Sequence, residues 1–194
     1  MTRFRLRTVI PLTLFLLAAF GRSAHAQAPY YNIPVYDAEA KRYFMLVDAR
    51  LPGSVYPRNE GLTWEGADEE ARARLYKGVH GRLAIVDSIE VHEFLLRTFH
   101  ADVPAWIGLR YLCRTHRLLK ADGSFMNASS FKAWDPVWNQ DTGGCQGKLD
   151  TMRPVFGEIY MPVAYYAHPT FDWVAKGWAK RYLLYFVEFP TGHP

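Results

Sequence analysis

Three short apolar segments limit the fold of this chain more than any other feature. They cover residues 81–86, 106–109 and 185–189, and they draw on aromatic, β-branched and glycine residues. This composition is typical of a buried strand, in which a glycine allows another backbone or a bulky ring to come close. The sequence therefore predicts buried β-structure at three separated places in the chain.

Two further segments have the periodicity of amphipathic helices. The first covers residues 64–76, where Thr63 offers a capping hydroxyl and acidic residues occupy the first turns. The second begins after Ser88 in the same manner and ends near His100. The apolar faces consist of Trp64, Ala67, Ala71 and Leu75 in the first segment and of Val91, Phe94, Leu95 and Phe99 in the second.

The other predicted strands cover residues 43–47, 105–112 and 182–189. Residues 118–121 are a candidate hairpin partner of the second of these, and the turn at residues 121–123 contains Gly123. Residues 135–177 show little periodicity and many glycines and prolines. We predict a long loop there, and loops of this size in compact domains are usually functional.

The order of these segments resembles the C-type lectin-like domain. That resemblance spans residues 43–190 and implies an α+β fold, with two helices packed on an antiparallel β-sheet and a long loop region that carries the ligand site. It also implies a bacterial exported member, because the usual family disulfide between the first helix and the last strand has no cysteines here. The matching residues are Leu62, Thr63, Trp64, Glu65, Ala67, Leu83, Ala84, Ile85, Ser88, Trp106, Ile107, Gly108, Leu109, Val187, Glu188 and Phe189.

The chain begins like an exported protein. Residues 1–26 combine a basic start, an apolar run over residues 9–20 and an Ala-x-Ala ending, the pattern of a cleaved signal peptide. A membrane anchor is the alternative, although the run is shorter than the roughly 17–25 residues that cross a bilayer. We expect a periplasmic or secreted protein, with a lead-in at residues 27–42, the domain at 43–190 and a tail at 191–194.

Charge argues against a nucleic-acid partner. Removal of residues 1–26 takes away Arg3, Arg5, Arg7 and Arg22, so the 23 basic residues become 19 and balance the 19 acidic ones. Phosphate binding needs a retained basic surface, so we expect no nucleic-acid binding. No later stretch has transmembrane length.

The two cysteines, Cys113 and Cys145, both lie in the exported part. An even pair in an oxidising compartment predicts one disulfide, which would contribute roughly 3–4 kcal/mol in the chain-entropy model. The alternative is two separate buried thiols. A zinc or redox site is disfavoured because the close C-x-x-C spacing is absent.

The resemblance also shows where the usual calcium site of sugar-binding members is degenerate. Those members hold calcium with a Glu-Pro-Asn or Gln-Pro-Asp triplet and a Trp-Asn-Asp step, because the hard cation takes six to eight oxygens. Here Trp138, Asn139 and Gln140 stand at the triplet, and Trp178 is followed by Ala179 and Lys180. We therefore expect no cofactor, although calcium bound by other loop carboxylates stays possible.

The long loop supplies the candidate ligand-binding residues. Aromatic faces stack on sugar rings or anchor protein interfaces, and carboxylates and amides bond sugar hydroxyls, although the alternative is that most of these rings fill the core. The candidates are Trp138, Asn139, Asp141, Glu158, Tyr165, Tyr166, Asp172 and Trp173.

Catalytic motifs are missing. No metalloprotease histidine pair, nucleophile elbow, P-loop or dinucleotide fingerprint occurs in the sequence. The sequence therefore predicts a non-catalytic exported recognition protein that binds carbohydrate (a glycan) through the long loop. The alternative is a protein–protein interaction or scaffold module of an exported or envelope assembly.

Overall fold

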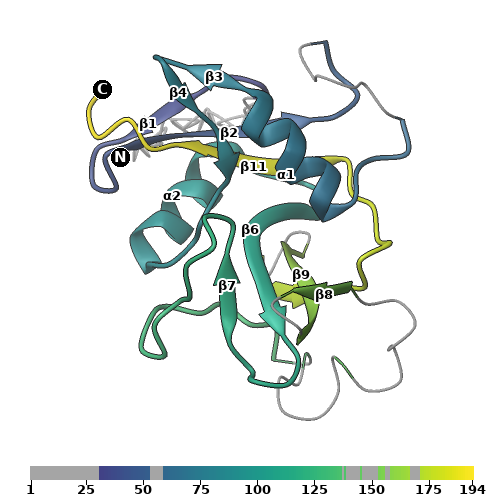
Figure 1. Cartoon of the computed structure of the whole chain (residues 1–194). Coiled ribbons are helices and arrows are strands. Elements are labelled where there is room, and N and C mark those ends of the chain that lie inside the picture. The colour runs from purple at the N-terminus through teal and green to yellow at the C-terminus, as the bar shows by residue number, and fades with distance from the viewer. Residues whose placement is uncertain are drawn as a thin grey trace, which may run out of the picture.

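The computed structural model describes residues 31–52, 59–136, 138, 145, 153–155, 158–166 and 171–194, with only the backbone of 153–155 and 158. In this part of the chain two helices pack on a mostly antiparallel sheet, so the expected α+β architecture is confirmed (Figure 1). The predicted signal peptide lies outside the described residues.

Three strands form the centre of the sheet: β2 (Arg42–Asp48), β11 (Leu184–Phe189) and β6 (Ala105–Leu112). The last strand, β11, runs antiparallel to β2 on one side and parallel to β6 on the other. Chain segments from both ends and the middle therefore lie side by side. Two of the three predicted apolar segments, 106–109 and 185–189, are central strands, and the third, 81–86, contributes only a two-residue strand at 82–83. The strand order is β1-β2-β11-β6-β9-β10.

Shorter strands complete this sheet. The lead-in contributes one of them, because β1 (Val35–Asp37) pairs with β2 along the sheet edge. The others are β5 (Arg82–Leu83) on β11, β7 (Leu118–Lys120) on β6, β8 (Arg153–Val155) on β9, β9 (Glu158–Tyr165) on β6, and β10 (Trp173–Ala175) on β9.

Both faces of the β2–β11 pair are buried, each under one helix. Alternate residues of a strand point to opposite faces, and those of β2 divide accordingly. Phe44 and Leu46 belong to the core under α2 (Ile89–Phe99), whereas Met45 belongs to the core under α1 (Trp64–Ala73). Figure 1 shows the two helices on either side of these strands. Two-sided burial explains why these strands are largely apolar on both faces.

Helix α1 is joined to β6 by two indole groups. Trp64 Nε1 donates to the carbonyl oxygen of Ile107 at 2.7 Å, and Trp106 Nε1 donates to that of Leu62 at 2.8 Å. Both rings are buried, so each bond satisfies a polar group that would otherwise be costly in the core. The Thr63 hydroxyl caps the helix, as predicted.

Helix α1 ends three residues earlier than predicted, at Ala73. The chain turns there into a hairpin of β3 (Leu75–Tyr76) and β4 (Val79–His80). The two residues between these strands, Lys77 and Gly78, have φ values of 48° and 77°. Two successive positive φ values are the geometry of a type I′ hairpin turn, so Gly78 marks the hairpin and not the helix end.

The prediction of a structureless long loop over residues 135–177 is wrong. Strands β8, β9 and β10 all lie within that range, and β9 is eight residues long. Residues 160–165 of β9 are all buried, so the strand lacks the alternation that marks a half-buried strand. Pro162 lies opposite Arg110, beside a register shift in the ladder, which is where a proline is tolerated.

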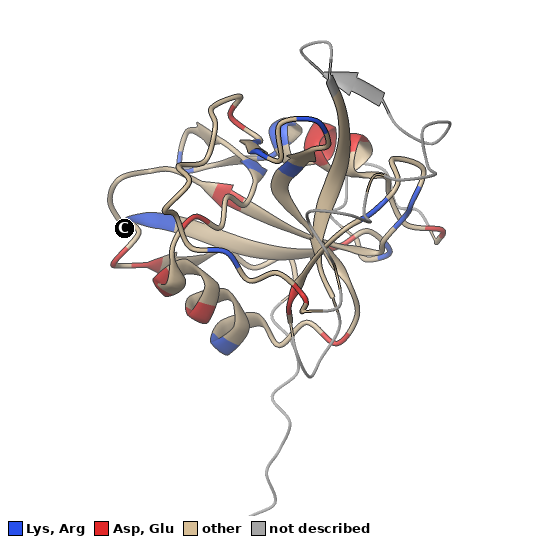
Figure 2. Ribbon diagram, turned by 90° about the horizontal axis from the view of Figure 1, so that it is seen from below, with Lys and Arg blue, Asp and Glu red and all other residues tan. Residues whose placement is uncertain are grey.

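No helix in the described ranges is long and apolar enough to span a bilayer. Charged residues of both signs are distributed over the described ribbon (Figure 2).

Candidate functional site

Aromatic rings gather between strand β6, which carries Tyr111, and strand β10, which begins with Trp173. The rings of Trp134 and Trp138 are stacked, with centroids 4.3 Å apart and an interplanar angle of 19°. Tyr111 of β6 meets both edge-on, at 5.7 Å from Trp134 and 5.0 Å from Trp138. We call Tyr111, Trp134, Trp138 and Trp173 the tryptophan cluster. Edge-to-face and offset-stacked pairs are the favourable aromatic geometries.

Strand β10 holds the tryptophan cluster in place through a ring contact and two backbone hydrogen bonds. Trp173, at its start, meets Trp134 edge-on at 5.8 Å. The backbone N–H of Asp135 donates to the carbonyl oxygen of Trp173 at 3.0 Å, and the N–H of Trp173 donates to that of Ala133. These bonds join residues 133–135 to β10, so the backbone on either side of Trp134 is fixed to the sheet.

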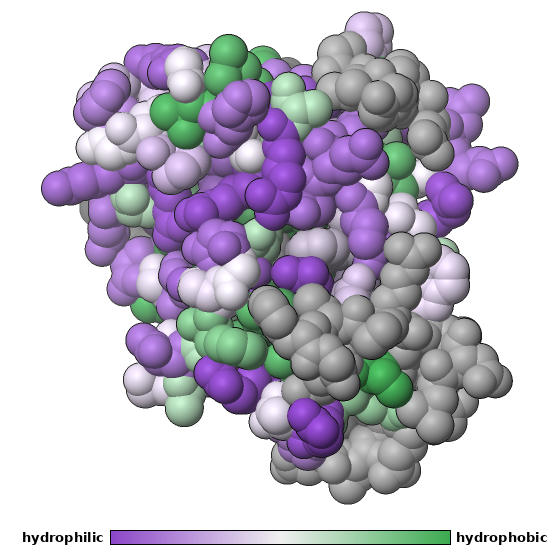
Figure 3. Space-filling view, viewed as in Figure 1, coloured by the Kyte–Doolittle hydropathy of each residue, from purple (hydrophilic) through white to green (hydrophobic). Residues whose placement is uncertain are grey.

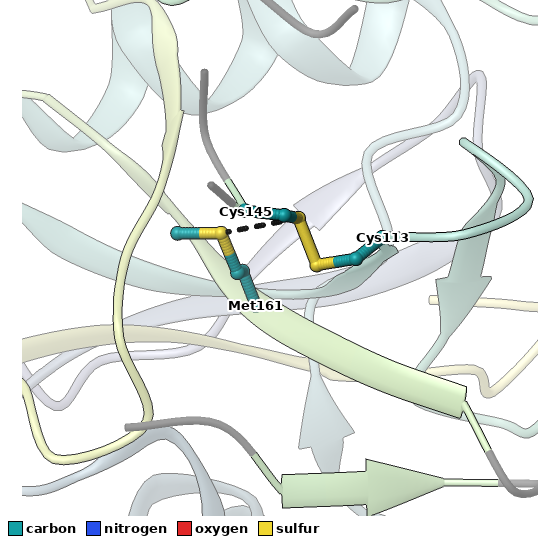
Figure 4. Close-up of a disulfide and its surroundings, with 3 residues drawn as sticks. All are labelled: Cys113, Cys145 and Met161. Carbon is teal, nitrogen blue, oxygen red and sulfur yellow. Dashed lines mark hydrogen bonds between the residues drawn. A yellow bond between two sulfur atoms is a disulfide. The ribbon is translucent and has the colours of Figure 1, made fainter. Parts of the chain in front are cut away.

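A disulfide joins the same region to β6. The predicted pairing of Cys113 with Cys145 is confirmed, with the two Cα atoms 5.8 Å apart, which excludes the alternative of two separate thiols. The Sγ atom of Cys145 lies 3.6 Å from the Sδ atom of Met161 on β9 (Figure 4). Because a disulfide sulfur carries no hydrogen, this is a packing contact. Residue 145 is thereby held against the sheet.

Two of the predicted ligand-binding residues belong to the core. Tyr165 and Trp173 are 1% and 0% exposed, so their rings fill the core, as the alternative interpretation of the loop aromatics expected. Tyr165 Oη lies 2.9 Å from Nδ1 of His92 on α2. Burial raises the pKa of Tyr165, and burial lowers the pKa of His92 against the opposing effect of Asp172 and Glu93. Both groups are therefore neutral near pH 7, and their hydrogen bond is a structural contact between α2 and β9.

Other candidates lie at the surface or outside the described residues. Trp138 and Asp172 are half-buried, and Tyr166 is 46% exposed with the Lys176 ammonium 5.4 Å above its ring. Glu158 begins β9, and its side chain is not described. Asn139 and Asp141 fall outside the described residues.

A groove that the sequence did not indicate adjoins the tryptophan cluster. Its cavity of about 450 Å³ lies between the turn after β6 and the segment around residue 127. The His116 ring at the groove lies 6.0 Å from the buried ring of Tyr111, which also packs on Trp138, so Tyr111 lies between the groove and the cluster. The lining residues are His116, Arg117, Leu118, Met126, Asn127, Ala128 and Lys132. These residues come together only because the chain after β7 turns back and pairs with it, so no sequence motif predicts the groove.

Comparison with known proteins rests on structure alone. No protein-family model and no curated protein matches the chain. The cow C-type carbohydrate-recognition domain of CD23, solved in the presence of a GlcNAc2Man3 oligosaccharide, aligns with a TM-score of 0.53 and 18% identity over 81% of this chain and 92% of that chain. The human scavenger receptor C-type lectin domain aligns with a TM-score of 0.51 and 14% identity, over 80% and 94%. The chain has the C-type lectin-like fold.

This lectin-like domain departs from the usual calcium site at a position that the structure corrects. Trp178 lies in a turn, and the tryptophan on the strand before the closing strand is Trp173. The residues that follow it are Val174 and Ala175, both hydrocarbon, so the two oxygen ligands of a Trp-Asn-Asp step are missing on either alignment. Among the described residues, no three His, Cys, Asp or Glu side chains gather as metal ligands.

Proposed function

We propose that this protein is an exported, non-catalytic recognition protein that binds glycans at Trp134 and Trp138, the two half-buried rings of the tryptophan cluster. The carrying observation is the stack of Trp134 on Trp138, which holds the half-buried ring of Trp138 in one orientation. An amphipathic ring held in one orientation stacks on a sugar without losing much conformational entropy. The two similar domains described above, called carbohydrate-recognition domains, support this choice of ligand.

Binding without the usual calcium site is part of the proposal. A calcium ion takes six to eight oxygen ligands, and the two strand positions after Trp173 supply none from their side chains. The aromatic cluster offers stacking, which needs no cation. We therefore expect the same glycan affinity in calcium and in chelator.

The titratable groups in the core support a non-catalytic role. His92 and Tyr165 face each other across α2 and β9, and both are explained by packing. Glu188 is fully buried and bonded to Arg42, Arg82 and the backbone N–H of Ile85. Such satisfied ion pairs hold strands together, so these buried groups have a structural role.

Export is supported by the disulfide, because such bonds persist in oxidising compartments. Purification of the protein from its native source and N-terminal sequencing test this point. We expect the mature chain to begin at Gln27, and an intact Met1 would contradict it.

A glycan array run in calcium and again in chelator tests the binding. We expect saturable binding in both conditions, reduced about tenfold or more in Trp138→Ala, since aromatic anchors dominate such contacts. Leu75→Ala is the matched control, because Leu75 is 62% exposed on β3, away from the cluster. Absence of saturable binding to every glycan would overturn the proposal, and strict calcium dependence would overturn its calcium-free part.

A second candidate is a protein-interaction module, favoured by the exposed Tyr166 with Lys176 above its ring. Tyrosine is enriched at interface hot spots. The face seen in Figure 3 is mainly hydrophilic, with apolar atoms in small separate patches, which is less than a large interface needs. A stoichiometric partner whose binding is lost in Tyr166→Ala and kept in Trp138→Ala would favour this candidate over glycan binding.

A further inference from the structure

We propose that the groove beside the tryptophan cluster binds an anionic group of the glycan, a carboxylate or a sulfate. This inference rests on the proposed glycan binding and names the chemical class of the ligand. The cavity of about 450 Å³ lies within the range of roughly 300–1,000 Å³ that is usual for small-molecule sites. It is large enough for a sugar unit and is built from two adjacent chain segments.

The groove has an apolar floor. Leu118 and Met126 are buried, and the backbone N–H of Met126 donates to the carbonyl oxygen of Leu118 at 2.9 Å. That bond continues the pairing of the two segments beyond the bridge between Leu119 and Phe125. The floor is therefore part of the folded core, and it offers the hydrocarbon surface on which a sugar face packs.

The rim carries positive charge. Two cationic side chains, Arg117 and Lys132, are exposed along it beside the ring of His116, and none of the described residues that line the groove is acidic. The Arg117 guanidinium lies 3.7 Å from the centroid of the Phe125 ring. A guanidinium stacked on a ring keeps its N–H edges available for a bidentate anion.

Lys132 is oriented by the backbone. Its Nζ donates to the carbonyl oxygens of Ala128 at 2.6 Å and Ser130 at 3.1 Å. An ammonium group has three donors, so these two bonds fix its position and leave one for a ligand. Preorganised donors lose little entropy when a ligand binds.

These two cations differ from the basic residues of the domain that are held in ion pairs. Arg42 and Arg82 lie 2.8 and 2.6 Å from carboxylate oxygens of Glu188, and Arg50 lies 2.6 Å from Asp48. Within the described ranges no carboxylate is at salt-bridge distance from Arg117 or Lys132. Their charge is therefore available to an anion that arrives from solvent. A glycan seated on Trp138 would pass over the buried ring of Tyr111, which packs between Trp138 and His116, to reach these cations.

Titration calorimetry with three saccharides tests the inference: trigalacturonic acid for a carboxylate, a heparin tetrasaccharide for a sulfate, and a neutral galactose trisaccharide. We expect at least one acidic probe to bind about tenfold more tightly than the neutral one. Arg117→Gln and Lys132→Gln should each weaken that binding about tenfold, the effect of losing one charge-assisted hydrogen bond. Raising NaCl from about 50 to about 500 mM should weaken the wild type and leave the double variant unchanged.

Arg97→Gln is the matched control, since it removes an exposed charge from α2 without touching the groove. Equal binding of neutral and acidic probes, or wild-type affinity in the double variant, would overturn the anionic site. If the neutral trisaccharide binds in a Trp138-dependent manner in either case, the proposed function stands without it. If no saccharide binds at all, both fail together.

Discussion

The hydroxyl of Tyr185 on β11 donates a hydrogen bond to Oε2 of Glu70 on α1. Both side chains are buried, and the Arg74 guanidinium lies 3.9 Å from the same carboxylate oxygen. In the C-type lectin-like family a disulfide usually joins the first helix to the last strand, and here neither element has a cysteine. The Glu70–Tyr185 bond links the same two elements by polar contact.

Removal of that hydroxyl should destabilise the domain. We expect Tyr185→Phe to lower the free energy of unfolding by about 1–3 kcal/mol, because Glu70 would stay buried with one donor fewer. For a domain of this size the melting temperature should fall about 2–4 °C per kcal/mol. Thermal melts check the value, and Tyr36→Phe is the control because Tyr36 is half-exposed and its ring packs on Tyr43. Equal stability of Tyr185→Phe and wild type would show that the bond contributes nothing.

Buried tyrosines make the fold sensitive to alkali. Burial raises the pKa of Tyr182 to about 12 and raises the pKa of Tyr165 and Tyr185 as well. In the unfolded chain tyrosine ionises near pH 10, so above that pH the unfolded state binds fewer protons than the folded state. The free energy of unfolding is therefore unaffected below about pH 10 and falls above it, by up to about 1.4 kcal/mol per pH unit for each such tyrosine. Denaturant titrations from pH 8 to 11 and absorbance at 295 nm measure the effect, and a constant stability to pH 11 would contradict it.

Two glycines should respond in opposite directions to alanine. A Cβ at Gly108 would stand 2.3 Å from the carbonyl oxygen of Leu83, a backbone atom that has no room to move. We expect Gly108→Ala to cost about 3 kcal/mol or more. At Gly66, in the first turn of α1, a Cβ meets nothing closer than 3.5 Å, so Gly66→Ala should stabilise by up to about 1 kcal/mol. Denaturant unfolding measures the change in stability of each variant. If Gly108→Ala also stabilised the domain, the close approach of β6 to β5 would be refuted.

Reduction of the disulfide should cost roughly 3–4 kcal/mol. Cys113 and Cys145 are 32 residues apart, and the chain-entropy model ties the stabilisation to that separation. The double variant Cys113→Ser, Cys145→Ser should show this loss in denaturant unfolding. A reductant should destabilise the wild type and leave the double variant unaffected. If reductant shifts both equally, the loss has another origin.

Periodicity predicted those parts of the fold in which a pattern has a single structural meaning. The capped helix after Ser88 and strand β6 match their predicted ranges to within a residue, because one apolar stripe and one apolar run mark them. Strand β9 was missed since burial on both faces removes alternation and Pro162 suggests a loop. Helix α1 was extended too far because Leu75 continues its apolar stripe, while the hairpin turn after Tyr76 is set by backbone φ angles.

The candidate site was predicted only in outline. Aromatic composition pointed to the half of the chain that contains the tryptophan cluster, but it does not separate rings that fill the core from rings at the surface, because both have the same chemistry. Trp173 and Trp178 illustrate the limit: only the pairing of β10 with β9 places Trp173 in the sheet and leaves Trp178 in a turn. The groove around Arg117 and Lys132 depends on tertiary contacts that no local pattern records.

Trp138 and Trp173 should therefore separate binding from stability. Trp173 is fully buried, so Trp173→Ala should cost about 3–5 kcal/mol, whereas half-buried Trp138 should lose only about 1 kcal/mol or so on truncation. Glycan affinity should respond in the reverse order: Trp138→Ala should weaken it about tenfold in protein that is still folded, and the milder Trp173→Phe should leave it within about twofold. Denaturant unfolding and calorimetry on the same samples measure both quantities. If Trp173→Phe reduced affinity without lowering the melting temperature, the ligand would have to contact β10. Trp173 would then be a binding residue and not only a core residue.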